Sequence, residues 1–296
     1  MDRFLITNDL FYNIFYVRER KVFAPNEKLK SLQREILKSI KEKFNINLNI
    51  KKIAKFHCNQ KWILKMDIED FYNSVPKEDI ITSINFIFPD IHNGNLLDKK
   101  LIYKLCTVND KLPVGAITSA HLANLSFCKI ENKIMEFCKS KKINYSRYMD
   151  DMFFSCEKKN ELNKIEKFVR TILEEHNYKI NENKIKYISD NKQQNILGVV
   201  VNNKEVKIKN LKKREYRALF FNYVKSIFLE ERLGVKHLFH KKINFDTING
   251  HLSYLKTTDP VFYKKCINYI SSTIHKFQVQ HNDEIKKLIK ILKIKF

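Results

Sequence analysis

The 296-residue chain is predicted to have an α+β fold, followed by a helical and strongly basic C-terminal part. Three observations support this prediction. Short apolar runs indicate strands at Trp62–Ile68, Asn144–Tyr148 and Met152–Cys156. Segments with apolar residues at helical spacing separate these runs. After about residue 209, only helical, lysine-rich segments remain.

Helices are predicted from the spacing of apolar residues and from residues that favour helix starts. The first is expected at residues 28–40, where apolar residues recur at helical spacing. Pro76 suits the first turn of another helix, because its missing N–H costs nothing there. One long helix is predicted from Ser119 to about Ser140, and a further helix at Leu162–Leu173.

Two hairpins are predicted from the order of strands and turns. The second and third predicted strands flank Asp150 and Asp151, which places these acids at a hairpin tip. The other hairpin is expected where Ile196–Val201 and Glu205–Ile208 flank the pair Asn202-Asn203.

The charge and cysteine content restrict the class of protein. Lys and Arg number 56 against 33 Asp and Glu, and the resulting charge of +23 favours a polyanionic partner. Coding from an AT-rich genome would produce the same excess of lysine without any function. The six cysteines form no Cys-x-x-Cys pair and are expected to be reduced core residues. No run approaches the ~20 apolar residues of a membrane span, and the N-terminus lacks signal-peptide order, which predicts a cytoplasmic protein without a membrane partner.

Short apolar runs end at, or begin after, acidic residues at two places in the sequence. These residues are Asp67 and the pair Asp150-Asp151. A buried carboxylate without a partner costs several kcal/mol, and a divalent metal would supply that partner. Three carboxylates around two Mg²⁺ ions form the arrangement that two-metal phosphoryl transfer requires. The alternatives are a helix-capping role for Asp67 and a solvated turn for the pair.

Four sequence boxes occur in the order found in reverse transcriptases, and together they resemble that family, in particular its bacterial retron branch. The resemblance covers about residues 50–215. The boxes are Asp67–Ser74, Leu112–Asn124, Tyr145–Ser155 with its Tyr-Met-Asp-Asp core, and the region from Asn181 to Asn202. The resemblance implies a right-hand polymerase architecture with fingers, a palm that contains an antiparallel sheet, and a helical thumb. The implied divisions are fingers at 1–60 and 80–111, palm at 61–79 and 112–208, and thumb at 209–296.

The same resemblance implies the catalytic residues. Asp67, Asp150 and Asp151 match the carboxylates that bind two Mg²⁺ ions, for which Mn²⁺ can substitute. The main-chain carbonyl of Ile68 is expected to complete one coordination shell. Lys184 matches the family lysine that protonates the pyrophosphate leaving group, although a lysine in so basic a chain is commonly a solvated side chain.

Four residues are expected to contact the incoming nucleotide or its template. Tyr72, next to Phe71, matches the aromatic residue beneath the sugar, where a ring favours dNTPs over rNTPs. Gly115 is expected to let the backbone approach the templating base closely. The family has glutamine where this chain has Val114, a departure that bears on fidelity and substrate preference.

Further residues are expected to contact nucleic acid. His57 lies in a segment similar to the retron Asn-Ala-x-x-His signature, with Ile53 in place of the asparagine, and a core histidine is the alternative. Gly198 and Asn202 match the hairpin that grips the primer end. Basic residues of the predicted thumb are expected to contact the duplex backbone; they are Lys212, Lys213, Arg214 and Arg217.

A retron enzyme would use a structured noncoding RNA as template and primer, dNTPs as substrates, and an RNA–DNA hybrid as product. Resemblance to that branch implies a branched RNA–DNA molecule (msDNA), an effector protein as partner and a role in anti-phage defence. A first alternative is another defence-associated reverse transcriptase, with protein-primed or template-independent DNA synthesis, which Val114 and Ile53 keep open. A second is a catalytically silent RNA-binding scaffold, which the charge of +23 supports.

Overall fold

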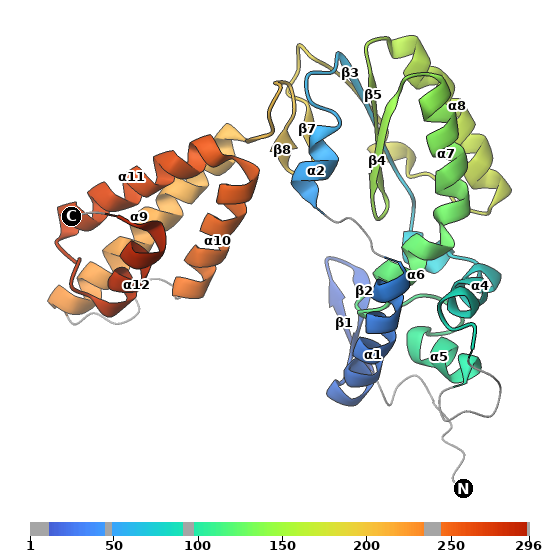
Figure 1. Cartoon of the computed structure of the whole chain (residues 1–296), viewed down its shortest axis with the longest axis horizontal. Coiled ribbons are helices and arrows are strands. Elements are labelled where there is room, and N and C mark those ends of the chain that lie inside the picture. The colour runs from blue at the N-terminus through green and yellow to red at the C-terminus, as the bar shows by residue number, and fades with distance from the viewer. Residues whose placement is uncertain (1–11, 45–48, 91–97, 234–243, 295–296) are drawn as a thin grey trace, which may run out of the picture. The chain divides into compact units, whose positions relative to one another are not determined.

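The computed structural model describes residues 12–44, 49–90, 98–233 and 244–294. The chain folds into two compact units (Figure 1). The first unit comprises Met1–Asn49 and Gln60–Lys192, and the second comprises Ile50–Asn59 and Gln193–Phe296. Mixed helices and antiparallel sheets confirm the predicted α+β class. Residues 1–11 and 45–48 of the predicted fingers lie outside the described residues, and the division into fingers, palm and thumb stays a prediction.

A four-stranded antiparallel sheet forms the centre of the first unit, in the order β4-β5-β3-β6. Its strands are β3 (Trp62–Asp67), β4 (Asn144–Tyr148), β5 (Asp151–Cys156) and β6 (Lys186–Ser189). Two helices, α7 (Cys128–Ser140) and α8 (Lys159–Glu175), pack against one face of this sheet (Figure 1). The strands predicted from the three apolar runs are confirmed, and β3 has a second neighbour, β6, that was not predicted.

The register of the sheet is set by apolar side chains that pair across the strands. Met66 lies opposite Met152 and Leu64 lies opposite Phe154. All four side chains are buried, at 1% exposure or less. Their packing fixes the pairing of β3 with β5, because a shift of one residue would turn the apolar face toward solvent.

The rest of the first unit is a hairpin and a set of helices. The hairpin consists of β1 (Tyr12–Val17) and β2 (Arg20–Pro25). The helices are α1 (Glu27–Lys43), α3 (Phe71–Ser74), α4 (Lys77–Ile87), α5 (Lys99–Cys106) and α6 (Ser119–Ser126), with a 3-10 turn, η2, at Glu182–Lys184. The predicted helices at 28–40 and 162–173 are confirmed within α1 and α8, and α4 starts directly after Pro76.

The single long helix predicted from Ser119 to Ser140 is wrong, because the chain bends at Phe127 between α6 and α7. The Phe127 ring is fully buried and lies edge-on to Phe71 and Tyr178, with ring centroids 5.6 and 5.4 Å away. At the bend, the Cys128 thiol donates to the Asn124 carbonyl at 3.4 Å. Packing of Phe127 into the core therefore overrides the continuous helical pattern.

The second unit contains a small sheet of β7 (Asn195–Ile196), β8 (Val199–Val200) and β9 (Lys207–Ile208). The predicted strand at Ile196–Val201 is split by a tight turn at Leu197-Gly198, where φ is +46° and +88°. Positive φ at both central residues matches a type I′ hairpin turn. The predicted hairpin around Asn202-Asn203 is confirmed in its pairing, because β8 pairs with β9, although the connection that holds the two asparagines is longer than a two-residue turn.

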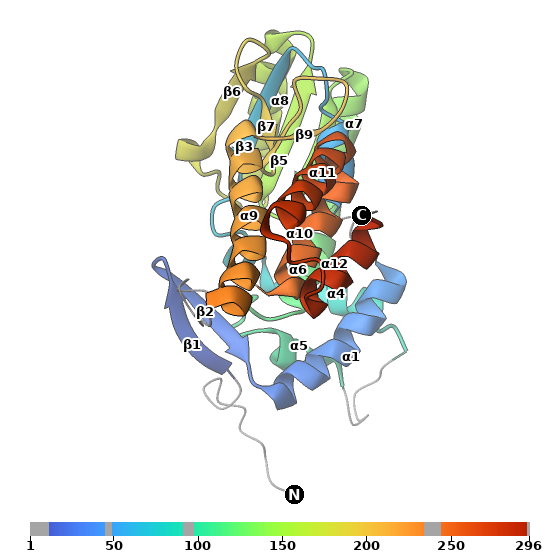
Figure 2. The same ribbon diagram turned by 90° about the vertical axis from the view of Figure 1, so that its left-hand side faces the viewer.

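Four helices complete the second unit: α9 (Asn210–Leu233), α10 (Phe245–Thr258), α11 (Pro260–Phe277) and α12 (Asp283–Leu292). Figures 1 and 2 show α9 and α11 running side by side. The short helix α2 (Ile50–Lys55) belongs to the same unit, where the Asn59 amide donates to the Val201 carbonyl at 2.9 Å. None of the described helices is both long and apolar enough to cross a membrane.

Asp259 joins three elements of the second unit. Its carboxylate accepts the amide N–H of Phe262 at 3.0 Å, which caps α11, and the amide of Ile208 in β9 at 3.0 Å. The Lys213 ammonium of α9 lies 3.0 Å from the same carboxylate. Burial alone would raise the pKa of Asp259, but the two amides and Lys213 lower it below its ordinary value. A buried charge with three partners stabilises the fold only while it is ionised.

The substitution Asp259→Asn is expected to destabilise the protein by about 2–3 kcal/mol, because Lys213 loses its charged partner. The contribution of Asp259 should be present above the ordinary carboxyl pKa and be lost as the pH falls through its lowered value. Urea unfolding of the full chain, followed by circular dichroism at neutral and acidic pH, measures both effects. The matched control is Asp283→Asn, whose exposed ion pair with Lys286 should contribute less than about 0.5 kcal/mol. Equal unfolding free energies for the two variants would contradict the prediction.

Candidate active site

Three carboxylates meet at one end of the central sheet. Asp67 ends β3 and pairs directly with Asp151, the first residue of β5. The Asp150 carbonyl accepts the amide of Ile68 at 3.0 Å, so the hairpin tip is held against the end of β3. Paired residues on antiparallel strands have Cα atoms about 4.5–5.5 Å apart. The structure therefore brings together Asp67, Asp150 and Asp151, here called the acidic triad.

The acidic triad carries unbalanced negative charge. Asp67 is buried, at 4% exposure, and the other two are half-buried. Burial raises the pKa of Asp150, and the neighbouring Asp67 raises it further. Burial also raises the pKa of Asp151, with Asp150 and Asp67 as further causes. Such mutual repulsion is relieved when a cation lies among the carboxylates.

Lys184 supplies a cation to the triad from the 3-10 turn η2. Its ammonium lies 2.7 Å from the Asp67 Oδ1 atom. An ion pair connects this turn to α8: the Arg170 guanidinium of α8 lies 2.5 Å from Glu182 of η2. Arg170 also pairs with Glu166 of α8 at 2.8 Å. The contact places Lys184 at the acidic triad, while its predicted role as proton donor to the pyrophosphate leaving group stays a prediction.

A pocket of about 610 Å³ opens beside the acidic triad. Its wall includes Asp67, Asp150, Ile68 and Lys184, all expected from the sequence. Asp151 is not part of this wall. The pocket is large enough for a nucleotide-sized ligand.

Sequence reasoning missed Lys111 and two further basic residues of this pocket, Arg20 and Lys21. Both lie at the start of β2, and Arg20 lowers the pKa of Asp150 by its charge. The sequence signal for this hairpin was a pair of apolar runs separated by Arg18 and Glu19. In the structure, both of these residues adopt positive φ in the hairpin turn. Arg and Glu are not typical of a type I′ turn, whereas Asn-Gly is, so the sequence did not predict the hairpin.

The predicted nucleotide-binding residues occupy different positions. Tyr72 and Phe71 both line the pocket, Tyr72 half-buried and Phe71 at 4% exposure. Val114 also lines the pocket, and its carbonyl accepts the Phe23 amide of β2 at 2.7 Å. The structure thus places three of the four at the pocket wall.

Gly115 is the exception. It is not among the residues of the pocket wall. Its φ is +110°, and a Cβ atom there would lie 2.7 Å from the Phe23 carbonyl oxygen. The missing side chain therefore allows the close approach of β2, and the approach of a templating base to Gly115 stays a prediction.

Three predicted contacts with nucleic acid lie in the second unit. His57 is fully buried, and burial lowers its pKa to about 3. This placement leaves no His57 surface for nucleic acid and corrects the predicted contact in favour of a neutral core histidine. Gly198 is exposed at the β7–β8 turn, with no atom within 4 Å of a Cβ built on it. Asn202 accepts the Gln194 amide at 2.7 Å, so its side chain closes the small sheet.

The four basic residues predicted to contact a duplex lie on α9. Lys213 is mostly covered, at 20% side-chain exposure, and pairs with Asp259. The structure therefore gives Lys213 an internal partner in place of the predicted phosphate. Lys212, Arg214 and Arg217 are exposed, and their contact with nucleic acid stays a prediction.

The residues of the acidic triad fit a divalent metal. Carboxylate oxygens are hard donors of the kind that Mg²⁺ prefers, and their raised pKa values indicate charge that a cation would balance. In the described ranges, no three carboxylate, histidine or cysteine side chains form a ready-made metal cluster. Asp67 forms an ion pair with the Lys184 ammonium.

An antiparallel sheet that presents acids beside a pocket with several basic residues has the fold of template-directed polymerases. Two solved structures with this fold are apo telomerase from Candida tropicalis and the foamy viral protease-reverse transcriptase in complex with double-stranded DNA. The first is 12% identical, with a TM-score of 0.50, over 95% of this chain and 66% of that one. The second is 15% identical, with a TM-score of 0.50, over 95% of this chain and 43% of that one. At these identities the likeness concerns the fold.

The profile of the reverse transcriptase (RNA-dependent DNA polymerase) family matches residues 18–201. The chain therefore belongs to this family, whose activity is RNA-directed DNA synthesis and whose fold implies use of a divalent metal. The Retron Ec86 reverse transcriptase of Escherichia coli is 28% identical over 92% of this chain and 84% of its own length. The Retron Ec83 enzyme of Escherichia coli is 27% identical over 83% of this chain and 81% of its own length. Within the family, the chain is of the bacterial retron type.

Proposed function

We propose that this protein copies a structured noncoding RNA into DNA, starting from a 2′-hydroxyl group of that RNA, and yields a branched RNA–DNA molecule. The observation that carries the proposal is the acidic triad beside a pocket whose wall also holds Arg20, Lys21, Lys111 and Lys184. The likeness to retron reverse transcriptases over most of the chain supports this choice of RNA and product. A role in anti-phage defence beside an effector protein belongs to the same proposal.

In this proposal the acidic triad and the Ile68 carbonyl hold two Mg²⁺ ions, with Mn²⁺ as a substitute. When bound, such ions lower the pKa of the attacking hydroxyl and neutralise charge on the leaving pyrophosphate. The side chains of the triad are already aligned by the pairing of β3 with β5. This prior alignment contributes to the rate because no reorganisation is needed during the reaction.

Other residues of the pocket bind and orient the nucleotide. Arg20 at the pocket wall is placed to attract the triphosphate. The Tyr72 ring blocks the space that a 2′-hydroxyl would need, and Phe71 supports it with a centroid distance of 5.8 Å. Lys184 donates a proton to the leaving pyrophosphate. The central sheet serves as the palm, the β1–β2 hairpin as part of the fingers, and α9–α12 as the thumb on the hybrid duplex.

Sequencing the nucleic acid that copurifies with the protein tests the proposed product. Branched DNA joined through a 2′-linkage to its own RNA is the expected result. Homopolymeric DNA, or DNA attached to a tyrosine, would point to template-independent or protein-primed synthesis. A purified protein that binds RNA but incorporates no dNTP on a primed RNA template with Mg²⁺ would support the scaffold alternative.

The substitution Lys184→Gln is expected to lower the rate of dNTP incorporation about 100-fold, the size of effect typical for loss of a general acid. Single-turnover primer extension separates this effect from nucleotide binding, because the apparent dNTP affinity should change much less. Lys184→Arg keeps a positive charge beside Asp67, which the Lys184 ammonium contacts at 2.7 Å, but arginine donates a proton poorly. This variant should therefore recover only part of the rate.

Lys186→Gln is the matched control for Lys184→Gln. This residue is two positions further on, in β6, and is exposed. Its loss removes one positive charge from the same region without touching Asp67. Equal rates for the Lys184 and Lys186 variants would exclude a specific role for Lys184.

A further inference from the structure

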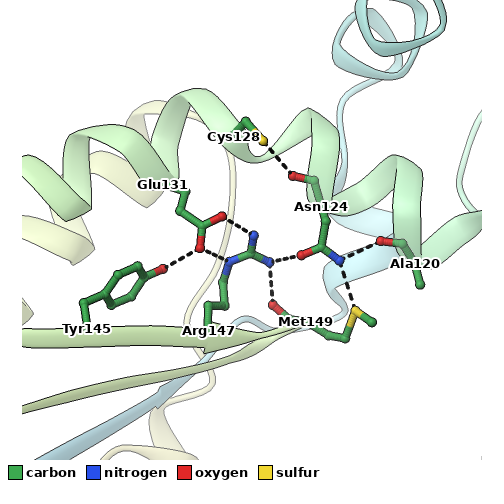
Figure 3. Close-up of polar contacts among 7 residues, drawn as sticks. All are labelled: Ala120, Asn124, Cys128, Glu131, Tyr145, Arg147 and Met149. Atoms are coloured by element: carbon green, nitrogen blue, oxygen red, sulfur yellow. Dashed lines mark hydrogen bonds and ion pairs between the residues drawn. The ribbon is translucent and has the colours of Figure 1, made fainter. Parts of the chain in front are cut away.

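Arg147 is the centre of a buried polar network beneath the acidic triad (Figure 3). It lies on β4, and its side chain is only 3% exposed. The guanidinium binds Glu131 of α7 through two nitrogens, at 3.0 and 2.6 Å. Its Nη1 atom donates to Asn124 Oδ1 of α6 at 2.7 Å and to the Met149 carbonyl at 2.8 Å. One side chain thus connects the strand that enters the hairpin tip with two helices.

Met149 is the residue that this network holds in an unfavourable conformation. Its φ of +55° lies in the left-handed region, which costs a residue with a side chain roughly 1–2 kcal/mol. Arg147 binds its main-chain carbonyl, and the Asn124 amide lies 3.1 Å from its sulfur atom. The two contacts hold Met149 at both its backbone and its side chain.

The conformation of Met149 decides where the next two side chains point. Asp150 and Asp151 follow it directly, and Asp151 pairs with Asp67 across the sheet. A relaxed backbone at Met149 would rotate the following peptide and move the Asp150 carbonyl from the Ile68 amide, now 3.0 Å away. The geometry of the triad therefore depends on the contacts that Met149 makes.

We propose that Arg147 is a positioning residue: clamped by Glu131 and Asn124, it holds Met149 in the left-handed conformation that orients Asp150 and Asp151 toward Asp67. This inference rests on the proposed catalytic role of the triad. The network also reaches the helix after β3, since the guanidinium stacks 4.6 Å from the Phe127 ring and 5.7 Å from the Phe71 ring. Phe71 is the neighbour of Tyr72, so the clamp links the acids with the nucleotide pocket.

Arginine is required for this task, because its planar fork offers five donors in fixed directions. Two donors are used on Glu131 and the Nη1 group serves Asn124 and Met149. A lysine at the position keeps the charge near Glu131 but cannot reach all three acceptors at once. Arg147→Lys therefore separates the charge of the buried pair from the geometry of the clamp.

The experiment compares Arg147→Lys with the wild-type protein in three measurements on the full chain. These are kcat and KM for dNTP on a primed RNA, binding of Mn²⁺ followed by electron paramagnetic resonance, and the thermal unfolding temperature. We expect kcat to fall about 10- to 100-fold, as for a displacement of reacting groups by about 1 Å. KM should stay within about threefold of the wild-type value, since Arg20, Lys21 and Lys184 of the pocket wall are not part of the Arg147 network, and Mn²⁺ binding should weaken in the folded protein.

Tyr145→Phe is the matched control, because its hydroxyl group donates to Glu131 at 3.2 Å and makes no contact with Met149 that would be lost. Its kcat should remain within about twofold of the wild-type value. If Arg147→Lys does not fold, Asn124→Ala decides the question, because it removes one anchor of the guanidinium and the contact with the Met149 sulfur.

A folded Arg147→Lys protein with unchanged kcat and unchanged Mn²⁺ binding would overturn the inference, as would unchanged kcat in Asn124→Ala. Loss of activity that only tracks the loss of folded protein would also overturn it. The proposed catalytic role of the triad is tested separately with a double variant, Asp150→Asn with Asp151→Asn. That role fails only if this double variant remains active.

Discussion

Replacing Asp150 and Asp151 together with asparagine is expected to lower dNTP incorporation on a primed RNA by at least about 1000-fold, or ~4 kcal/mol of transition-state stabilisation. Asparagine keeps the shape of each side chain but removes the negative charge that would hold a divalent metal. RNA binding should be unchanged, because the exposed lysines and arginines that attract phosphate are untouched. Single-turnover primer extension and fluorescence anisotropy with the same RNA measure the two quantities.

The same double substitution is expected to raise the thermal unfolding temperature in the absence of divalent metal. Burial and the neighbouring carboxylates raise the pKa of Asp150 and Asp151. A carboxyl group whose pKa is raised in the folded state destabilises the fold as the pH rises above its ordinary value, and the penalty is complete above the raised value. Differential scanning calorimetry in chelator should show a gain at neutral pH that shrinks under acidic conditions. Full activity in this folded variant would refute the assignment of the triad.

Gly115→Ala is expected to destabilise the first unit by about 2–4 kcal/mol and to raise KM for dNTP. The added methyl group would lie 2.7 Å from the Phe23 carbonyl oxygen, and the φ of +110° is strained for alanine. Relief of this clash moves β2 away from Val114, and with it Arg20 at the pocket wall. Urea unfolding and steady-state incorporation kinetics report the two effects.

Two other glycines provide matched controls for Gly115→Ala. Gly198 also has a positive φ, +88°, but nothing lies within 4 Å of a Cβ there, so Gly198→Ala should cost only about 1 kcal/mol. Gly250 lies in α10 with open space around it, and Gly250→Ala should stabilise the protein by about 0.5–1 kcal/mol. The assignment of a close contact with β2 fails if Gly115→Ala costs no more than Gly198→Ala.

Local patterns were sufficient to predict the centre of the molecule. The apolar run at Trp62–Asp67 and the acids between the runs around Asp150 marked β3 and the β4–β5 hairpin. Their association follows from the burial of both strands, which share a face of Met and Leu side chains. For these elements the sequence signal and the tertiary packing agree, so a local interpretation was enough.

Contacts between distant segments could not be predicted in the same way. Lys213 appeared to be one of several exposed cations, and only the fold shows that Asp259 is its partner. Phe127 continued a helical pattern, and only its burial against Phe71 and Tyr178 shows why the helix bends. Arg147 was visible beside the acid pair, but its three acceptors come from residues 16 to 23 positions away and from a backbone carbonyl. Such roles depend on which elements meet in space.

The pairing of Asp67 with Asp151 has a consequence for how this gene can tolerate change. Side chains alternate between the two faces of a strand, so removing or adding a single residue within Trp62–Asp67 would turn every later side chain to the opposite face. Asp67 would then enter the apolar layer, and an apolar neighbour would take its place at the rim, Ile68 after a deletion or Met66 after an insertion. An in-frame deletion or insertion of one codon in β3 is therefore as damaging as the loss of the aspartate itself, even when all three acids are still encoded.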